Sequence, residues 1–168
     1  MISCQGFLAF PQENCVALRI RKAHVRDADA MTALAMRSKQ SNGYDDAFMQ
    51  ACIGELQVTA AKLAEAEYWV AEEDGICGMV SLLPSVEKTS AEIGAFFIDP
   101  ALKRQGIGRR LWEELLAHAK AKGFTLLQLD ADPAAVTFYE KLGFKTVREV
   151  PSGSIPGRYL PQMELTLG

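Results

Sequence analysis

Apolar residues recur along this chain with two different spacings, and together these spacings predict both strands and helices. Short apolar or alternating runs bounded by turn residues predict strands at 17–22, 68–73, 76–83, 90–98, 125–130, 144–150 and 159–167. Apolar positions three or four residues apart predict helices at 27–39, 46–55, 59–65, 108–122 and 133–142. Because these elements do not strictly alternate, the order indicates an α+β fold whose sheet mixes parallel and antiparallel pairs.

Turn and cap residues support these boundaries. Asp74-Gly75 is a strong type I′ signal and predicts a hairpin between the second and third strands. Asp27 is the predicted cap of the first helix, and Asp132 followed by Pro133 predicts the start of the last one. Gly143 then predicts that the last helix ends in a left-handed residue.

Length and composition predict one domain. The chain has 168 residues, of which 49% are hydrophobic and 23% charged, enough to bury a sizeable core. We expect the domain to span 17–168. Residues 1–16 precede the first predicted strand and are expected to form a loosely ordered extension.

Charge and cysteine content narrow the function classes. The net charge of -3 gives no general attraction to nucleic acid. Four cysteines without a Cys-x-x-Cys pair and two histidines predict no metal site, with Cys52 and Cys77 as buried thiols. No apolar run approaches the roughly 20 residues of a membrane span, and the N-terminus lacks the features of a signal peptide, so we expect a cytoplasmic protein without a membrane partner.

The most informative segment is the basic turn at 99–110, which lies between the apolar run 95–98 and a helix. The first N–H groups of a helix lack intrahelical partners and carry partial positive charge, so they attract oxyanions. Glycines allow a ligand to approach the backbone closely, and nearby Lys and Arg side chains add charge. The segment therefore predicts a site for a small phosphate ligand; the alternative is a basic helix-cap loop that binds nothing.

The spacing of this turn resembles the acetyl-CoA pyrophosphate loop of the GNAT superfamily of N-acetyltransferases. The family pattern, Gln/Arg-x-x-Gly-x-Gly/Ala, falls here on Lys103, Gly106 and Gly108, with Lys in place of the usual Arg or Gln. A P-loop would need Gly-Lys-Ser/Thr, and a dinucleotide fingerprint would need a small residue where Leu111 stands.

A second segment strengthens the resemblance. Residues 127–144 end in Phe-Tyr-Glu-Lys-Leu-Gly-Phe and are similar to the family's strand and helix hallmark, with Asp132 where the family commonly has Asn. The resemblance implies a single-domain, mixed central sheet that splays between 90–98 and 125–130, with acetyl-CoA in the opening and the backbone of Phe96 and Ile98 pairing with pantetheine. The full set of cofactor-binding residues that it implies is Phe96, Phe97, Ile98, Lys103, Arg104, Gln105, Gly106, Ile107, Gly108, Arg109, Asp132, Ala135 and Phe138.

Two residues are the predicted catalytic groups. An alkyl ammonium of pKa near 10.4 must lose a proton before it can attack a thioester, and a departing thiolate benefits from a proton donor. By resemblance Tyr139 is that donor, although it could instead be a packed helix aromatic. Glu92 is the predicted base, or alternatively a surface carboxylate, and strand alternation would place it on one face with Gly94 and Phe96 unless a bulge near Gly94 shifts the register.

The acceptor is expected to lie between two loops, 40–46 and 151–158, which flank its entrance in this fold. Tyr44, Ser152, Ser154 and Arg158 are the predicted substrate-binding residues, with Arg158 and a serine orienting a polar or carboxylate-bearing acceptor. The sequence thus predicts direct acetyl transfer to a small-molecule amine. The alternatives are a protein or peptide acceptor and an acyl-CoA sensor without turnover; many family members dimerise, so the resemblance also allows a homodimer.

Overall fold

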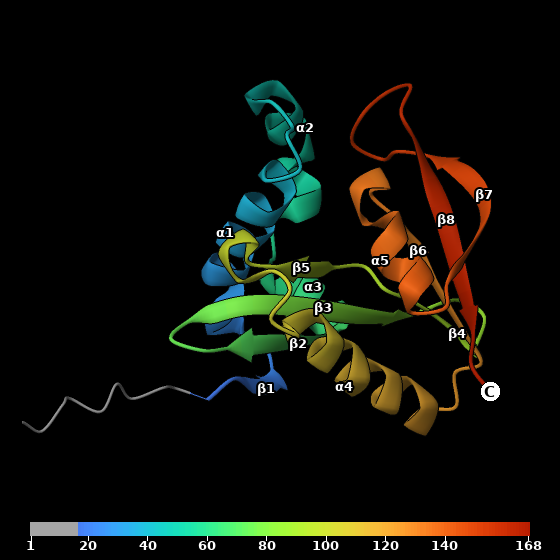
Figure 1. The fold of residues 1–168 in the computed structure, drawn as a ribbon. Coiled ribbons are helices and arrows are strands. Elements are labelled where there is room, and N and C mark those ends of the chain that lie inside the picture. Colours follow the sequence, from blue (N-terminus) through green and yellow to red (C-terminus); the bar gives the residue numbers. More distant parts are fainter. Residues whose placement is uncertain (1–16) are drawn as a thin grey trace, which may run out of the picture.

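The computed structural model describes residues 17–168, and the extension expected at 1–16 lies outside the described residues. Its strands are β1 Arg19–Lys22, β2 Glu67–Glu72, β3 Ile76–Pro84, β4 Ser90–Glu92, β5 Phe96–Ile98, β6 Leu126–Asp130, β7 Lys145–Pro151 and β8 Tyr159–Thr166. Its α-helices are α1 Ala28–Gln40, α2 Asp46–Leu56, α3 Ala60–Glu65, α4 Ile107–Ala121 and α5 Val136–Lys141. The predicted α+β class is confirmed (Figure 1).

The sheet runs in the order β1-β2-β3-β4-β6-β8-β7, and β5 pairs with β3 beside that path. The pair β4 and β6 is parallel, while the other pairs are antiparallel. Pairing between β4 and β6 extends to Glu92 and Gln128, and the Ile93 N–H still donates to the Gln128 carbonyl at 2.9 Å. Beyond this point β5 follows β3 while β6 follows β8, so the sheet divides as expected (Figure 1).

The strand predicted over 90–98 is interrupted by a bulge, and this corrects the predicted facing of Glu92. Leu83 pairs with Glu92 but Val80 pairs with Phe96, so one extra residue lies on the 90–98 side. The Ala95 N–H donates to the Ser81 hydroxyl at 2.8 Å within the bulge. Consequently Glu92 does not share a face with Phe96, because the bulge inverts the alternation between them.

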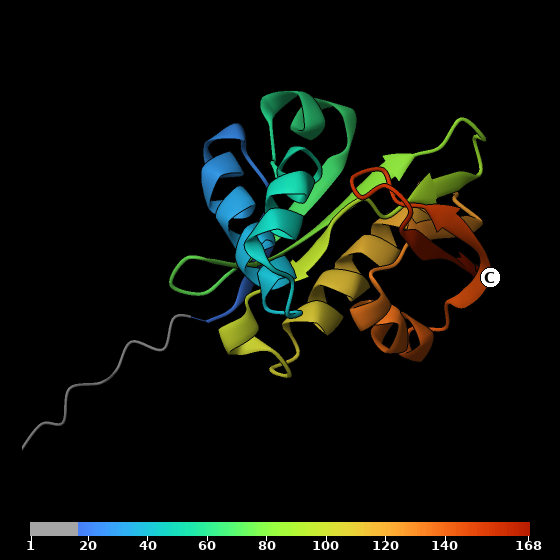
Figure 2. The same cartoon turned by 90° about the horizontal axis from the view of Figure 1, so that it is seen from above.

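Helices cover the sheet from two sides and create two cores (Figure 2). On one side α1 and α2 bury Met31, Leu34 and Cys52 against β2 and β3. On the other side α4 buries Leu111 and Leu115 together with residues of β6 and α5. The sheet face opposite α4 and α5 at the C-terminal half carries polar side chains from β4, β6 and β8, since the buried residues of β6 point the other way.

Several local predictions are refined. Asp27 stands at the start of α1 but does not cap it; its carboxylate instead accepts from Arg21 Nη1 at 2.7 Å and from the His24 N–H at 2.8 Å. The helix predicted from residue 133 begins as a 3₁₀ turn, Pro133–Ala135, in which Asp132 accepts from the Ala134 N–H. None of the helices within 17–168 has the length and hydropathy needed to cross a bilayer.

Candidate active site

A cleft of about 650 Å³ opens where the sheet divides, and most of the predicted cofactor residues line it. Its walls come from β5, the turn before α4, the end of β6 and the start of α5. Gln105 is the one predicted cofactor residue that does not line the cleft. Tyr139 lines it as well, whereas Glu92, Tyr44, Ser152, Ser154 and Arg158 do not.

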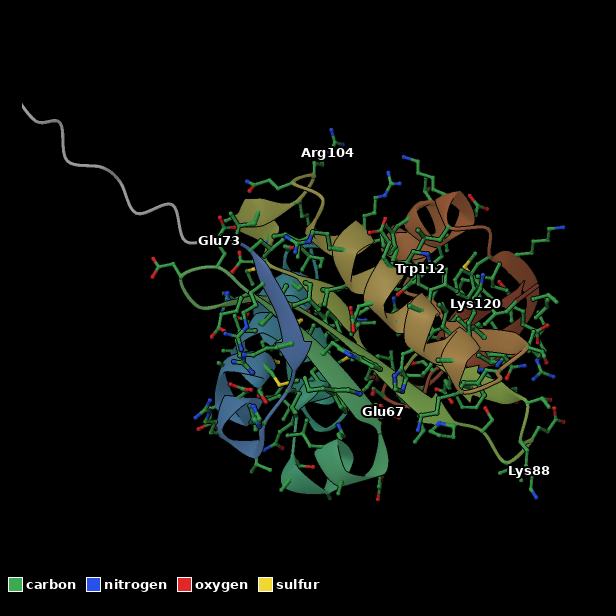
Figure 3. The ribbon with its side chains drawn as sticks, turned by 90° about the horizontal axis from the view of Figure 1, so that it is seen from below. Glu67, Glu73, Lys88, Arg104, Trp112 and Lys120 are labelled. Carbon is green, nitrogen blue, oxygen red and sulfur yellow. The ribbon has the colours of Figure 1, made fainter. Side chains whose placement is uncertain are left out.

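The turn before α4 presents backbone N–H groups that can donate hydrogen bonds to a ligand. Gly106 has φ +81°, a left-handed conformation that glycine adopts readily, and the first intrahelical hydrogen bond of α4 runs from the Arg110 N–H to the Gly106 carbonyl. The preceding N–H groups of α4 therefore have no intrahelical partner. Lys103 donates to the Ser41 hydroxyl at 3.2 Å, and Arg104 extends from the turn (Figure 3). This cationic helix start fits a pyrophosphate.

The backbone of β5 supplies a second row of polar groups. The Asp99 N–H donates to the Cys77 carbonyl and the Ser81 N–H donates to the Ala95 carbonyl, so these alternate residues face β3. Phe96 and Ile98 occupy the intervening positions, and their N–H and carbonyl groups point away from β3, on the side of the cleft. Such an edge can pair with the amides of pantetheine, so the residues present fit the expected cofactor.

Tyr139 is held at the wall of the cleft by aromatic neighbours. Its ring packs edge-on against Phe138 at 5.3 Å and Phe144 at 5.7 Å between centroids, and the residue is 8% exposed. Burial, and secondarily the charge of Asp132, raise the pKa of the Tyr139 hydroxyl. The hydroxyl therefore stays protonated at neutral pH.

Glu92 lies on β4 next to the dividing point of the sheet. Its side chain is exposed on the polar face, and desolvation by the surrounding protein, followed by the charge of Asp130, raises its pKa above the ordinary 4.5. A carboxylate with a raised pKa is a better proton acceptor than an ordinary one. Its predicted role as a base is therefore chemically compatible with its position.

A buried polar group, here called the Asp132 cluster, joins elements far apart in sequence. It consists of Lys39, Tyr44, Asp132 and Arg158. Asp132 accepts from Lys39 Nζ at 2.7 Å and from the Tyr44 hydroxyl at 2.9 Å, while Arg158 Nη2 donates to the Tyr44 oxygen at 2.6 Å and lies 3.6 Å from Asp132. Although burial opposes it, hydrogen bonds from Lys39 and the backbone lower the pKa of Asp132. The Asp132 carboxylate is thus fully engaged within the protein.

The cluster extends into a bridge between the two loops that were expected to flank the acceptor. The Tyr44 ring stacks on Phe48 at 4.0 Å, and the Arg158 guanidinium lies 4.8 Å from the Phe48 centroid. The Ser154 hydroxyl donates to Glu55 of α2, while Ser152 accepts from the Ile155 N–H within its own loop. The structure therefore brings Tyr44, Ser154 and Arg158 into one bridge and leaves Ser152 outside it.

Sequence reasoning missed four charged residues that line the cleft: Lys39, Glu55, Asp130 and Lys141. A signal for Lys39 exists, because it continues the buried stripe of α1 formed by Met31, Leu34, Ala35 and Ser38. A lysine on the buried face of a helix needs a partner. That partner, Asp132, is 93 residues away in the sequence, so no local sequence pattern identifies it.

Comparisons with known proteins agree with this geometry. The family model of the GNAT acetyltransferase domain matches residues 32–167. The peptidyl-lysine N-acetyltransferase YjaB of Salmonella typhimurium is 32% identical over 131 residues, which are 76% of this chain and 83% of that protein. Human N-acetyltransferase 8 is 32% identical over 107 residues, which are 58% of this chain and 47% of that protein.

Among solved structures, the PaiA N-acetyltransferase of Thermoplasma acidophilum in complex with coenzyme A superposes with a TM-score of 0.74 at 21% identity, covering 90% of this chain and 99% of that one. The fold, the cleft and the family match together lead to one conclusion: the chain belongs to the GNAT family of acetyl-CoA-dependent N-acetyltransferases.

Proposed function

We propose that this chain transfers an acetyl group directly from acetyl-CoA to the primary amine of a small molecule. The observation that carries the small-acceptor proposal is the bridge across the acceptor side. Arg158 binds Tyr44 and Ser154 binds Glu55, so the loop 151–158 is tied to the α1–α2 region. A bridged entrance disfavours a folded protein surface and favours a compact acceptor.

Binding of the donor uses backbone more than side chains. The N–H groups at the start of α4 would hold the pyrophosphate, with charge added by Lys103, Arg104 and Arg109. The outward-facing backbone of Phe96 and Ile98 would align the pantetheine in the cleft. When bound, acetyl-CoA supplies an activated acyl carbon as a thioester.

Two side chains would carry out the proton transfers of the reaction. An alkylamine is neutral in only about one molecule per 2,500 at pH 7, a disadvantage of roughly 4.6 kcal/mol for attack through its lone pair. Glu92, with its raised pKa, would accept the amine proton. Tyr139, held protonated by burial, would give a proton to the departing sulfur.

A peptide acceptor is the second candidate, because the relative YjaB is named for peptidyl-lysine acetylation. The bridge would then have to accommodate an extended lysine side chain rather than a whole small molecule. A sensor without turnover is less well supported, since Tyr139 lies at the cleft wall with its proton retained.

Calorimetry with acetyl-CoA and CoA, followed by thiol release across amines, amino acids, polyamines, aminoglycosides and lysine peptides, tests the proposal. We expect binding and release with a small amine. Tyr139→Phe should keep acetyl-CoA affinity and lower kcat by about 10²–10⁴-fold. Tyr159→Phe is the matched control, since Tyr159 is 59% exposed on β8. Faster release with peptides would favour the second candidate, and binding without any release would favour the sensor.

A further inference from the structure

Asp130 lines the cleft but has no role in the mechanism proposed above. It ends β6, and it shares the cleft with Gly94 and Tyr139. Glu92, the proposed base, lies on the adjacent strand, where β4 pairs with β6 at Gln128. Asp130 therefore lines the cleft, whereas the neighbouring carboxylate of Glu92 does not.

The position of Asp130 on its strand directs it to the face from which an acceptor can approach. Leu127 and Leu129 of β6 are buried in the core beneath α4 and α5, so Gln128 and Asp130 lie on the opposite face. Tyr139 belongs to that same buried core. Asp130 and Tyr139 therefore reach the cleft from opposite faces of the sheet.

Among residues 17–168 no basic side chain forms an ion pair with Asp130, in contrast to Asp132. A neutral amide, Gln162 Nε2, donates to the Asp130 carboxylate at 3.1 Å, and Gln162 Oε1 is itself fixed by Arg148 Nε at 2.7 Å. Asp132 instead binds Lys39 directly. The amide of Gln162 orients the Asp130 carboxylate without neutralising it, so the carboxylate can still bind a cation.

An alkylamine reaches the protein as an ammonium ion and has to be held near a base before it can react. We infer that Asp130 binds the protonated acceptor amine in the cleft and holds it beside Glu92. This inference rests on the proposed function and adds the acceptor class, namely amines that are cationic at neutral pH. The charge of Asp130 also helps to raise the pKa of Glu92, which favours the proton transfer that follows.

One ammonium N–H bond breaks and an O–H bond forms on Glu92; the freed nitrogen lone pair then bonds to the acyl carbon as the carbon–sulfur bond breaks. The sulfur takes a proton from Tyr139. The remaining excess proton on nitrogen goes to solvent, from which Tyr139 is reprotonated, and Glu92 releases its proton to solvent.

The test compares an acceptor with its uncharged analogue. Calorimetry on CoA-saturated protein measures binding of the best alkylamine from the panel and of the alcohol with the same skeleton. Asp130→Asn should weaken amine binding about tenfold or more, as expected for loss of a charge-assisted hydrogen bond, and should change alcohol binding by less than about twofold. Asp130→Glu, which retains the charge, should keep most of the amine affinity.

Glu164→Gln is the matched control. Glu164 lies on the same polar face but accepts from Gln128 Nε2 at 2.8 Å and does not line the cleft. It should leave amine binding and KM unchanged. The melting temperature and acetyl-CoA affinity of each variant establish that it is folded; if Asp130→Asn does not fold, Asp130→Ser replaces it.

Equal weakening of amine and alcohol binding, or an effect of Glu164→Gln as large as that of Asp130→Asn, would overturn the inference. If no amine in the panel is acetylated, the proposed function fails first. If amines are acetylated and Asp130→Asn binds them normally, the inference fails alone.

Discussion

The ion pair between Lys39 and Asp132 should be strongly coupled, and a double-mutant cycle measures this directly. The two charged atoms lie 2.7 Å apart, and the side chains are 9% and 13% exposed. Asp132→Asn leaves the Lys39 ammonium without a counter-charge, and breaking a buried pair in this way costs about 3 kcal/mol. Lys39→Met should cost less, about 1.5 kcal/mol, because Asp132 keeps Tyr44 and Arg158 as partners.

If the two side chains acted independently, the double variant would lose the sum of these values, about 4.5 kcal/mol. Once one charge has been removed, however, the other is no longer part of a pair, so we expect a loss near 2.5 kcal/mol and a coupling energy of about 2 kcal/mol. Urea unfolding at pH 7, monitored by tryptophan fluorescence, gives the four free energies of unfolding, and unchanged m-values would show that the denatured state is comparable.

The exposed pair Arg109 and Glu113 provides the control cycle. Its side chains are 81% and 59% exposed at a similar separation of 3.0 Å, so its coupling should stay below about 0.5 kcal/mol. A coupling for Lys39 and Asp132 no larger than that of the control would refute the view that burial makes this pair strong. It would also remove the physical basis for treating the Asp132 cluster as a rigid bridge.

Three further predictions concern the turn before α4, the proposed base and an ion-paired glutamate at the start of β2. Gly106→Ala should cost about 1–2 kcal/mol of stability, because φ is +81°, and should raise KM for acetyl-CoA by displacing the α4 amides; kinetics and thermal melts check both. Burial and Asp130 raise the pKa of Glu92, and a base must be ionised, so kcat should fall as pH drops through that raised pKa, and Asp130→Asn should shift this acidic limb to lower pH. Although burial opposes it, Lys22 and His118 lower the pKa of Glu67 from 4.5 to about 2. The resulting stability is present above pH 4.5 and lost toward pH 2, so Glu67→Gln should lower the melting temperature by about 2 °C at pH 7 and by less below pH 4.

Features set by neighbouring residues could be predicted from the sequence. The hairpin at Asp74-Gly75, the glycine turn before α4 and the helix stop at Gly143 depend on backbone conformations that a few adjacent residues determine. The sequence predicts the bulge at 93–95 only as an alternative, because its position depends on how β3 pairs with both β4 and β5. Register between strands is set by long-range packing, and short segments do not encode it alone.

The two halves of the candidate site differ in this same respect. The proposed donor half consists of contiguous backbone at the start of α4 and along β5, so motif spacing alone predicts it. The proposed acceptor half consists of side chains from α1, the α1–α2 loop, the end of β6 and the β7–β8 loop, which only the fold brings together. Substitution of one such side chain can change the acceptor while the donor site stays intact. Family membership therefore identifies the acetyl donor more securely than the acceptor amine. To identify the amine, the charge of the acceptor half and the bridge across it must be tested.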